Sequence, residues 1–185
     1  RTEIGDKGGE AASYGDLGTV FHSLGRYARA EEYLQKALDI RTEIGDKGGE
    51  AASYRDLGNV FHSFGRYTRA EEYLQKALDI STKIGDRGGE AASRGNLGTV
   101  FRSLGQYVKA QEYLKEALII RTEIGDRGGE AASYGNLGTV FHSLGQYYKA
   151  EEYLQKALVI RTEIGDKGGE AASYGDLGTV FHSLG

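Results

Sequence analysis

A single stretch of 40 residues recurs along the whole chain. Residues 1–40 return at 41–80 with only four changes, and the stretch then recurs with further changes. The repeats span 1–40, 41–80, 81–120, 121–160 and, truncated, 161–185. A fixed period between about 20 and 50 residues is typical of solenoids, in which each repeat packs mainly on its neighbours. We therefore expect one array over residues 1–185.

The first half of each repeat has the pattern of an amphipathic helix, here called helix A. In the first repeat Asp6 is the expected N-cap, and Glu10 lies near the positive end of the helix dipole. Gly25 is expected to end the helix in the left-handed conformation. Between them, apolar side chains follow at spacings of three and four, which indicates one buried face. These are Tyr14, Leu17, Val20, Phe21 and Leu24.

The second half of each repeat predicts another helix, here called helix B, which begins near Arg26. Its apolar positions in the first repeat are Tyr27, Ala30, Leu34, Ala37 and Leu38. The connections are only a few residues long, so consecutive helices must form antiparallel hairpins. Small residues at Gly18 and Ala30 would let the two helices approach closely. We expect helices A at about 7–24, 47–64, 87–104, 127–144 and 167–184, and helices B at about 26–44, 66–84, 106–124 and 146–164.

Composition argues against several classes of function. The 185 residues include no cysteine, which excludes disulfides and cysteine-liganded metals. The net charge of −4 argues against nucleic-acid binding. No apolar run approaches the roughly 18 residues of a membrane helix, and we expect no secretory leader. We expect a cytoplasmic protein with neither nucleic acid nor membrane as its partner.

Two patterns could be taken for a metal site and a phosphate-binding loop, and the sequence supports neither. Equivalent histidines recur once per repeat, at His22, His62, His142 and His182. Packed helices lie about 8–10 Å apart, too far for these imidazoles to share a metal ion. The glycine-rich GDKGGE segments precede helices, but they lack the Gly-Lys-Ser/Thr ending of a phosphate loop. We predict no metal, no cofactor and no enzymatic activity.

The fixed positions resemble the tetratricopeptide repeat. The family's pattern is matched, at its spacings, by Tyr14, Leu17, Gly18, Phe21, Ala30, Leu34 and Ala37. The usual proline near the end of helix B is absent, with Thr42 in its place, and the period is 40 rather than about 34. The phrases GNLG, SLGQY and EIGDxxGEA resemble the 40-residue repeats of the Pins/LGN spindle-orientation adaptors. They are also similar to the sensor arrays of some large NTPase-coupled signalling proteins.

The resemblance implies an all-α solenoid that forms a right-handed superhelix with the A helices on its concave face. In such families this face holds an extended or helical peptide of a partner protein. By position, the groove residues of this chain would be Arg55, Asn59, His62, Asn96, Thr99, Arg102, Asn136, Thr139 and His142. Aspartates or asparagines at the position of Asp16 would line the same wall.

Differences between the repeats concentrate on one face of helix A. The core positions keep their identity, while the positions of residues 14, 15, 16, 19 and 22 change. Arg55, Arg94 and Arg102 fall in the second and third repeats. We interpret them as part of a basic strip suited to an acidic peptide; neutral drift on a solvated face is the alternative. Arg94 replaces a packed tyrosine, so we expect its guanidinium to reach solvent over its neighbours and the third repeat to be the least stable.

The leading hypothesis is a non-enzymatic scaffold that holds a partner peptide in the groove. The alternative is a spacer or self-assembling rod without a dedicated ligand, of which an engineered or excised fragment is one form. The chain ends on a helix A, where Leu177, Val180 and Phe181 are expected to be exposed. Such uncapped, heterologous ends predict head-to-tail stacking.

Overall fold

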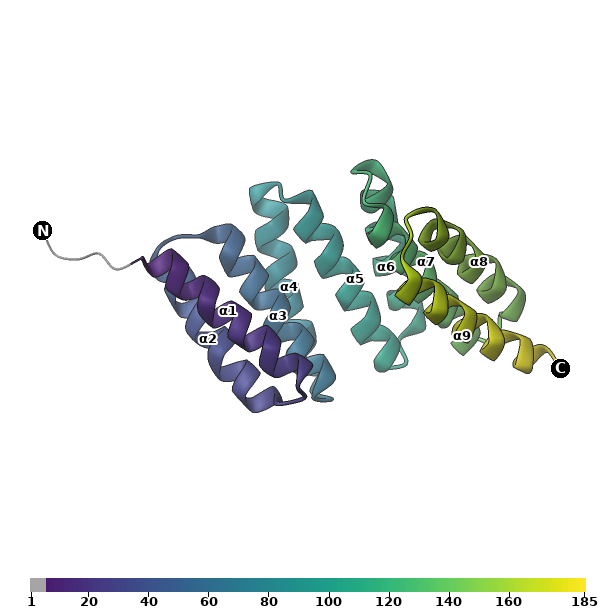
Figure 1. Ribbon diagram of the computed structural model, residues 1–185, viewed down its shortest axis with the longest axis horizontal. Coiled ribbons are helices and arrows are strands. Elements are labelled where there is room, and N and C mark those ends of the chain that lie inside the picture. The colour runs from purple at the N-terminus through teal and green to yellow at the C-terminus, as the bar shows by residue number, and fades with distance from the viewer. Residues whose placement is uncertain (1–5) are drawn as a thin grey trace, which may run out of the picture. The chain divides into compact units, whose positions relative to one another are not determined.

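The computed structural model describes residues 6–185, so the first five residues of the first repeat lie outside the described residues. The described chain forms nine α-helices and no strands (Figure 1), joined by turns of two or three residues. The helices are α1 (Lys7–Ser23), α2 (Tyr27–Glu43), α3 (Lys47–Ser63), α4 (Tyr67–Ile84), α5 (Arg87–Ser103), α6 (Tyr107–Glu123), α7 (Arg127–Ser143), α8 (Tyr147–Glu163) and α9 (Lys167–Leu184). Odd-numbered helices are helices A and even-numbered ones are helices B.

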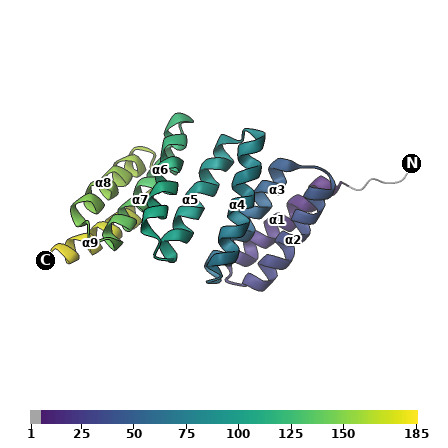
Figure 2. The same cartoon turned by 180° about the vertical axis from the view of Figure 1, so that it is seen from behind.

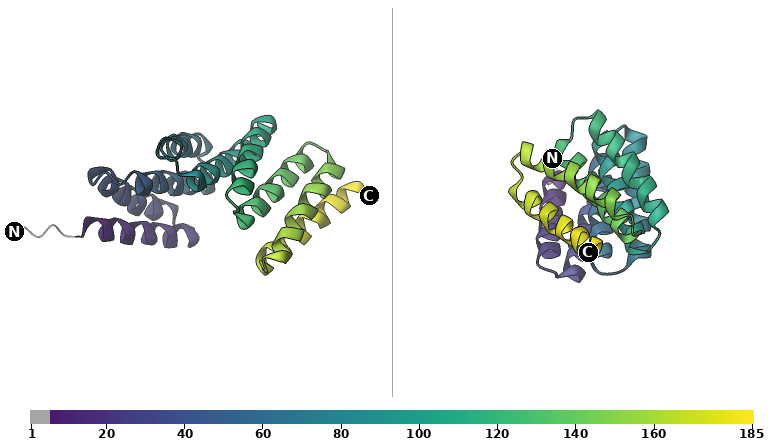
Figure 3. Two further views of the ribbon diagram at one scale, coloured as in Figure 1. Left: turned by 90° about the horizontal axis from the view of Figure 1, so that it is seen from above. Right: turned by 90° about the vertical axis from the view of Figure 1, so that its right-hand side faces the viewer.

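The chain divides into two compact units, Arg1–Asn96 and Leu97–Gly185, with the division inside α5. In the first unit α1 pairs with α2 and α3 with α4 as hairpins, and α2 packs on α3 (Figure 2). In the second unit α7 pairs with α8, while α6 packs on α7 and α8 on α9 (Figure 3). Each unit is a stack of helical hairpins, the arrangement of an α-solenoid. Each described helix is too short or too polar to span a lipid bilayer.

The helix ends follow the local sequence signals. Asp46 accepts a hydrogen bond from the backbone N–H of Gly49 at 2.9 Å, and Asp6 does the same for Gly9 at 2.8 Å. At the other end, Gly25 has a φ of +70°, and the N–H of Arg26 donates to the carbonyl oxygen of Phe21. This left-handed glycine terminates helix A and sets the turn into helix B. Both predictions about the caps are confirmed.

The core lies between the hairpins. In α3 and α4 the side chains of Leu57, Phe61 and Leu74 are at most 1% exposed. Gly58 permits the close approach of the two helices, because a Cβ atom built there would lie 2.6 Å from Leu74 Cγ. The sequence pointed to the small alanine of helix B as the facing residue. The nearest atoms instead belong to Leu74, and Ala70 contributes its carbonyl oxygen at 3.4 Å.

The two terminal helices differ in a way that corrects one expectation. Leu177 and Val180 of α9, expected to be exposed, are only 6% and 1% exposed because they pack on α8, which precedes them. The equivalent Leu17 and Val20 of α1 are 41% and 52% exposed, since no described helix precedes α1. Phe181 is half exposed, as expected.

Candidate functional site

The nine candidate residues lie on the faces of three A helices, and we call them the A-helix strip. Within each helix they follow at spacings of three or four, so they share a face. All nine are half-buried. The N-terminal unit contains Arg55, Asn59 and His62 on α3 and Asn96 on α5; the C-terminal unit contains Thr99 and Arg102 on α5 and Asn136, Thr139 and His142 on α7.

Within each unit, polar side chains join successive A helices. The amide nitrogen of Asn96 donates to the amide oxygen of Asn59 at 2.8 Å, which brings two strip residues together. His22 Nε2 lies 2.9 Å from the Ser63 hydroxyl. In the C-terminal unit, the same contact joins His142 and Ser183 at 3.0 Å. The recurring histidine therefore contacts a serine of the next helix A.

The strip residues of the C-terminal unit differ in whether their polar groups already make hydrogen bonds within the protein. The hydroxyl of Thr139 donates to carbonyl oxygens of its own helix, those of Asn136 and Gly135, at 2.8 and 3.2 Å. Arg102 Nε, in contrast, is buried and has no hydrogen-bond partner. A buried charged donor without an acceptor costs stability, so Arg102 is the place in the strip where an added acceptor would help most.

Each unit also contains an aspartate surrounded by positive groups. Burial raises the pKa of Asp56, and the charges of Arg55, Arg41 and His22 act in the opposite direction. In the C-terminal unit burial likewise raises the pKa of Asp176, opposed by Arg161, Arg102 and His142. Charges of strip residues, Arg55 on Asp56 and Arg102 and His142 on Asp176, therefore act on the aspartate position.

Sequence reasoning missed a set of arginines at the ends of the B helices. Arg41 extends from the end of α2 and donates from Nη1 to the Ser53 hydroxyl at 2.7 Å and to the Gly49 carbonyl at 3.2 Å, both on α3. Its other terminal nitrogen would lie 3.5 Å from a Cβ atom built at Gly15 of α1. Arg41 thus lies between two successive A helices. Arg121 and Arg161 make the same pair of hydrogen bonds in the C-terminal unit, to Gly129 and Ser133 and to Gly169 and Ser173.

The guanidinium groups of two of these arginines also lie close to a glycine of the preceding helix A. Gly15 and Gly135 are the residues over which the guanidinium groups of Arg41 and Arg161 lie. Between α4 and α5 the arrangement is altered, because Ser81 stands in place of the arginine and Arg55 in place of the glycine. The hydroxyl groups of Ser81 and Ser93 are buried there without a hydrogen-bond partner. The paired changes at positions 55 and 81 were the signal in the sequence that could have revealed this contact.

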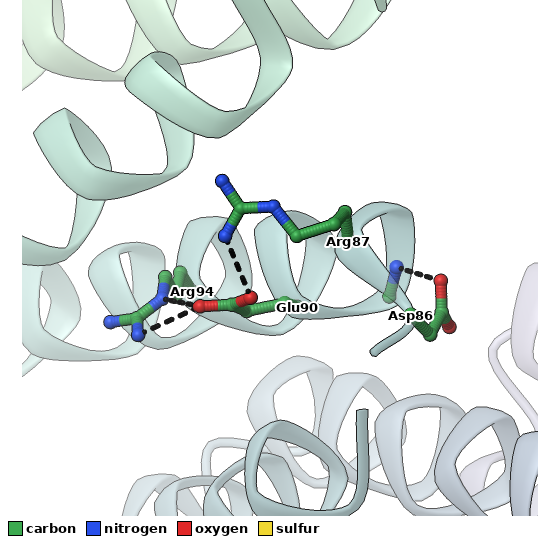
Figure 4. A network of polar contacts seen from close by, with 5 residues as sticks. Asp86, Arg87, Glu90 and Arg94 are labelled. Atoms are coloured by element: carbon green, nitrogen blue, oxygen red, sulfur yellow. Dashed lines mark hydrogen bonds and ion pairs between the residues drawn. The ribbon is translucent and has the colours of Figure 1, made fainter. Parts of the chain in front are cut away.

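Arg94 does not extend alone to solvent, as the sequence had suggested. Its Nε and Nη2 atoms both donate to Glu90 Oε1, at 3.1 and 3.0 Å (Figure 4). Arg87 donates to the other oxygen of Glu90 at 3.1 Å. Because Glu90 is one helical turn before Arg94, the guanidinium meets a nearly buried carboxylate on its own helix. The expectation about its path to solvent is therefore corrected.

The described residues do not assemble a metal site. Among residues 6–185, no group of three or more histidine or acidic side chains comes together in a way that could hold an ion. Several cavities instead lie beside the B helices and the turns. One of about 390 Å³ is lined by Lys115 of α6, Phe141 of α7 and Glu152 of α8, among others.

Comparison with known proteins identifies the repeat. The family model described as the tetratricopeptide repeat matches residues 9–83, 49–123, 89–158 and 129–185. No curated protein matches the chain. Among solved structures, the aspartyl phosphate phosphatase F of Bacillus subtilis is 18% identical with a TM-score of 0.87, and the match covers 98% of this chain and 49% of that one. The present chain thus spans about half the length of that protein.

Two further solved structures are similar over most of the chain. A putative kinesin light chain of Podosopora anserina, with nearly identical TPR-like repeats, is 20% identical with a TM-score of 0.74, over 94% of this chain and 86% of that one. A Rap protein complexed with competence and sporulation factor is 19% identical with a TM-score of 0.76, over 94% and 54%. At these identities the likeness establishes the fold alone. Because the family model matches nearly every described residue, the chain belongs to the tetratricopeptide repeat family.

Proposed function

We propose that the chain is a protein-interaction module that binds an acidic segment of a partner protein along the A-helix strip. The observation that carries the proposal is the buried Nε of Arg102, a charged donor without an acceptor. A carboxylate of a ligand could bind the guanidinium of this half-buried arginine, and charge-assisted hydrogen bonds of this kind are among the stronger ones. In the N-terminal unit, Arg55 of α3 is the strip residue with a positive charge.

The strip has the composition of a surface that recognises a peptide. Asn59 and Asn96 present amide groups, which can bind the backbone of an extended peptide as donors and acceptors. The Rap protein complexed with competence and sporulation factor shows a member of this fold holding a ligand, and we extend only that capacity to this chain. The 40-residue period leads us to propose a repeat of the Pins/LGN-like type. We propose no catalytic role.

A selection from a random peptide library tests this function with variants that the chain itself supplies. Arg102→His and Arg55→Gly install the residues that other repeats carry at these positions, so the fold is expected to persist. Charge reversal by Arg55→Glu and Arg102→Glu is the stronger perturbation. The proposal predicts enrichment of acidic peptides, with binding weakened in both pairs of variants. Equal binding by all variants would refute the assignment of the strip.

The second candidate is a structural rod that stacks head to tail. The observation in its favour is apolar exposure at both described ends, on Leu17 and Val20 of α1 and on Phe181 of α9. These faces differ, so the contact would be heterologous and open-ended. Light scattering should then show mass growing without limit as concentration rises, and Val20→Asp should stop the growth. A strict monomer at all concentrations would exclude the rod.

A further inference from the structure

A second surface is found on the outer face of α6 and α8, away from the A-helix strip. Four large apolar side chains are strongly exposed there: Val108 (70%), Ile119 (58%), Tyr148 (79%) and Val159 (56%). The other exposed large apolar residues lie at the turns, where they recur from repeat to repeat, or on the terminal helices α1 and α9. At the two equivalent positions of α2 and α4 the chain instead has Ala28 and Asp39, and Thr68 and Asp79.

On each helix the two exposed apolar residues lie at the two ends of a row of four residues that share one face. On α6 the row consists of Val108, Glu112, Lys115 and Ile119; on α8 it consists of Tyr148, Glu152, Gln155 and Val159. The spacing of four, three and four residues is that of a coiled-coil seam, which keeps all four side chains on one face. We call these two rows the outer seams. Both helices pack on α7 and line one cavity through Lys115 and Glu152, so the two seams flank that cavity.

Two charges in the α6 seam are available for an external partner. In α2 and α8 the seam glutamate is paired with a lysine one turn later, Lys36 at 2.7 Å and Lys156 at 2.6 Å. In α6 the lysine is moved by one position, to Lys115, which places it in the seam itself. Among the described ion pairs, neither Glu112 nor Lys115 takes part in one.

We propose that the outer seams bind a second molecule of this chain, across a two-fold axis that sets each helix antiparallel to its counterpart. The order of residues along α6 is complementary to itself in this orientation. Val108 then faces Ile119 of the second molecule, and Glu112 faces Lys115. Each apolar residue then contacts an apolar residue, and each charged residue contacts one of opposite charge. Because the contact is isologous, every such pair occurs twice.

The same axis satisfies α8. Tyr148 faces Val159 of the second molecule, and Glu152 faces Gln155, whose amide can donate to the carboxylate. The two seams occupy equivalent positions in successive repeats, and Lys115 and Glu152 at their middles line one cavity, so the pairing of α8 belongs to the same proposed contact. Applied to α4, this pairing would place Thr68 against Asp79, which offers no apolar contact. The N-terminal unit therefore lacks such a surface.

The area of the outer seams determines how tightly two molecules are expected to bind each other. Each helix has 17 residues and is about 25 Å long, and a helix with its side chains is about 10–12 Å wide. Two such helices in each molecule give roughly 1,000 Å² buried in total, the lower end of specific interfaces. The dimer should therefore be weak and dependent on concentration.

Sedimentation velocity on the full chain, from about 1 µM to about 500 µM, tests the proposal. The mass should rise with concentration toward twice that of one chain and stop there. Ile119→Asp with Val159→Asp, which installs the residues of α2 and α4, should keep the protein monomeric. Thr68→Ala, a matched change on α4 to the residue that α2 carries, should leave the association unchanged.

Charge exchange tests the antiparallel arrangement itself. Glu112→Lys should weaken association at least several-fold because it sets two lysines opposite each other, and Glu112→Lys combined with Lys115→Glu should restore it. A mixture of Val108→Cys and Ile119→Cys chains should form a disulfide-linked dimer under oxidation, and neither variant alone should. A monomer throughout the concentration range, association that survives Ile119→Asp with Val159→Asp, or failure of the charge exchange to restore it would each overturn the proposal. Unlimited growth in mass would point to the chain ends instead.

Discussion

Arg41 and Ser53 lie twelve residues apart and are joined by a hydrogen bond of 2.7 Å, from the guanidinium Nη1 to the serine hydroxyl. The serine is completely buried, so the arginine satisfies a polar group in the interior of the stack. It also connects the end of one helical hairpin to the next helix A. A contact of this kind binds neighbouring repeats together by a directional bond in addition to apolar packing.

Replacing Arg41 should therefore destabilise the array. Arg41→Ala leaves the Ser53 hydroxyl buried without a partner, for which we expect a loss of about 1–3 kcal/mol in the free energy of unfolding. Urea denaturation followed by circular dichroism measures it. Lys83→Ala, an exposed change near the end of α4, is the matched control and should alter stability by less than about 0.5 kcal/mol. Equal effects of the two changes would show that the hydrogen bond contributes nothing.

The altered contact between α4 and α5 should be open to repair. Arg55→Gly with Ser81→Arg restores the pair found elsewhere in the chain and supplies a donor for the buried Ser93 hydroxyl. We expect a gain of roughly 1 kcal/mol. Ser81→Arg alone should gain less, because the new guanidinium would meet the side chain of Arg55. A double-mutant cycle measures this coupling; purely additive effects would contradict it.

One substitution should have opposite effects at two equivalent glycines. An alanine Cβ at Gly138 would lie 2.6 Å from Leu154 Cγ, and we expect Gly138→Ala to cost about 1–3 kcal/mol in stability. At Gly178 nothing lies within 4 Å, so Gly178→Ala should stabilise the protein by up to about 1 kcal/mol through helix propensity. Thermal or urea unfolding of both variants measures the two changes in stability. Effects of the same sign would refute the role assigned to the close approach.

The burial of Asp56 should make the stability of the protein depend on pH. Because burial raises the pKa of this carboxyl in the folded protein, the unfolded chain loses its proton first as pH rises. Above the pKa of the folded protein, the ionised Asp56 therefore lowers the stability of the folded state. Below the unfolded pKa of about 3.9 the group is protonated in both states and has no such effect. Asp56→Asn, which installs the residue found at Asn96 and Asn136, should stabilise the protein at pH 7 and have little effect near pH 3. A gain that is larger at low pH would contradict this sign.

Features encoded locally could be predicted from the sequence. The aspartate cap at Asp46, the terminating glycine at Gly25 and the buried face containing Leu57 and Phe61 each depend on residues within one or two turns of helix. The spacing that defines helix A also placed Asn59 and Asn96 on equivalent faces, and a hydrogen bond joins the two side chains.

Features that depend on contacts between helices could not be predicted in the same way. Arg41 looks like an exposed charge at the end of a helix, and its partner becomes visible only when the next helix is packed beside it. Leu177 lies on the last described helix A and was expected to be exposed there, but the preceding helix α8 covers that face. For Arg94, the sequence showed the loss of a tyrosine but not the rotamer that reaches Glu90.

The central claim is that the A-helix strip binds an acidic segment of a partner protein. Its most direct test is the affinity of a selected acidic peptide, measured by fluorescence anisotropy for the unaltered chain, for Arg102→His and for Arg55→Glu with Arg102→Glu. Lys83→Glu, which changes charge on a helix B, is the control. We predict binding that weakens stepwise in the two strip variants and persists in the control. Equal loss in all variants, or none in any, would contradict the account.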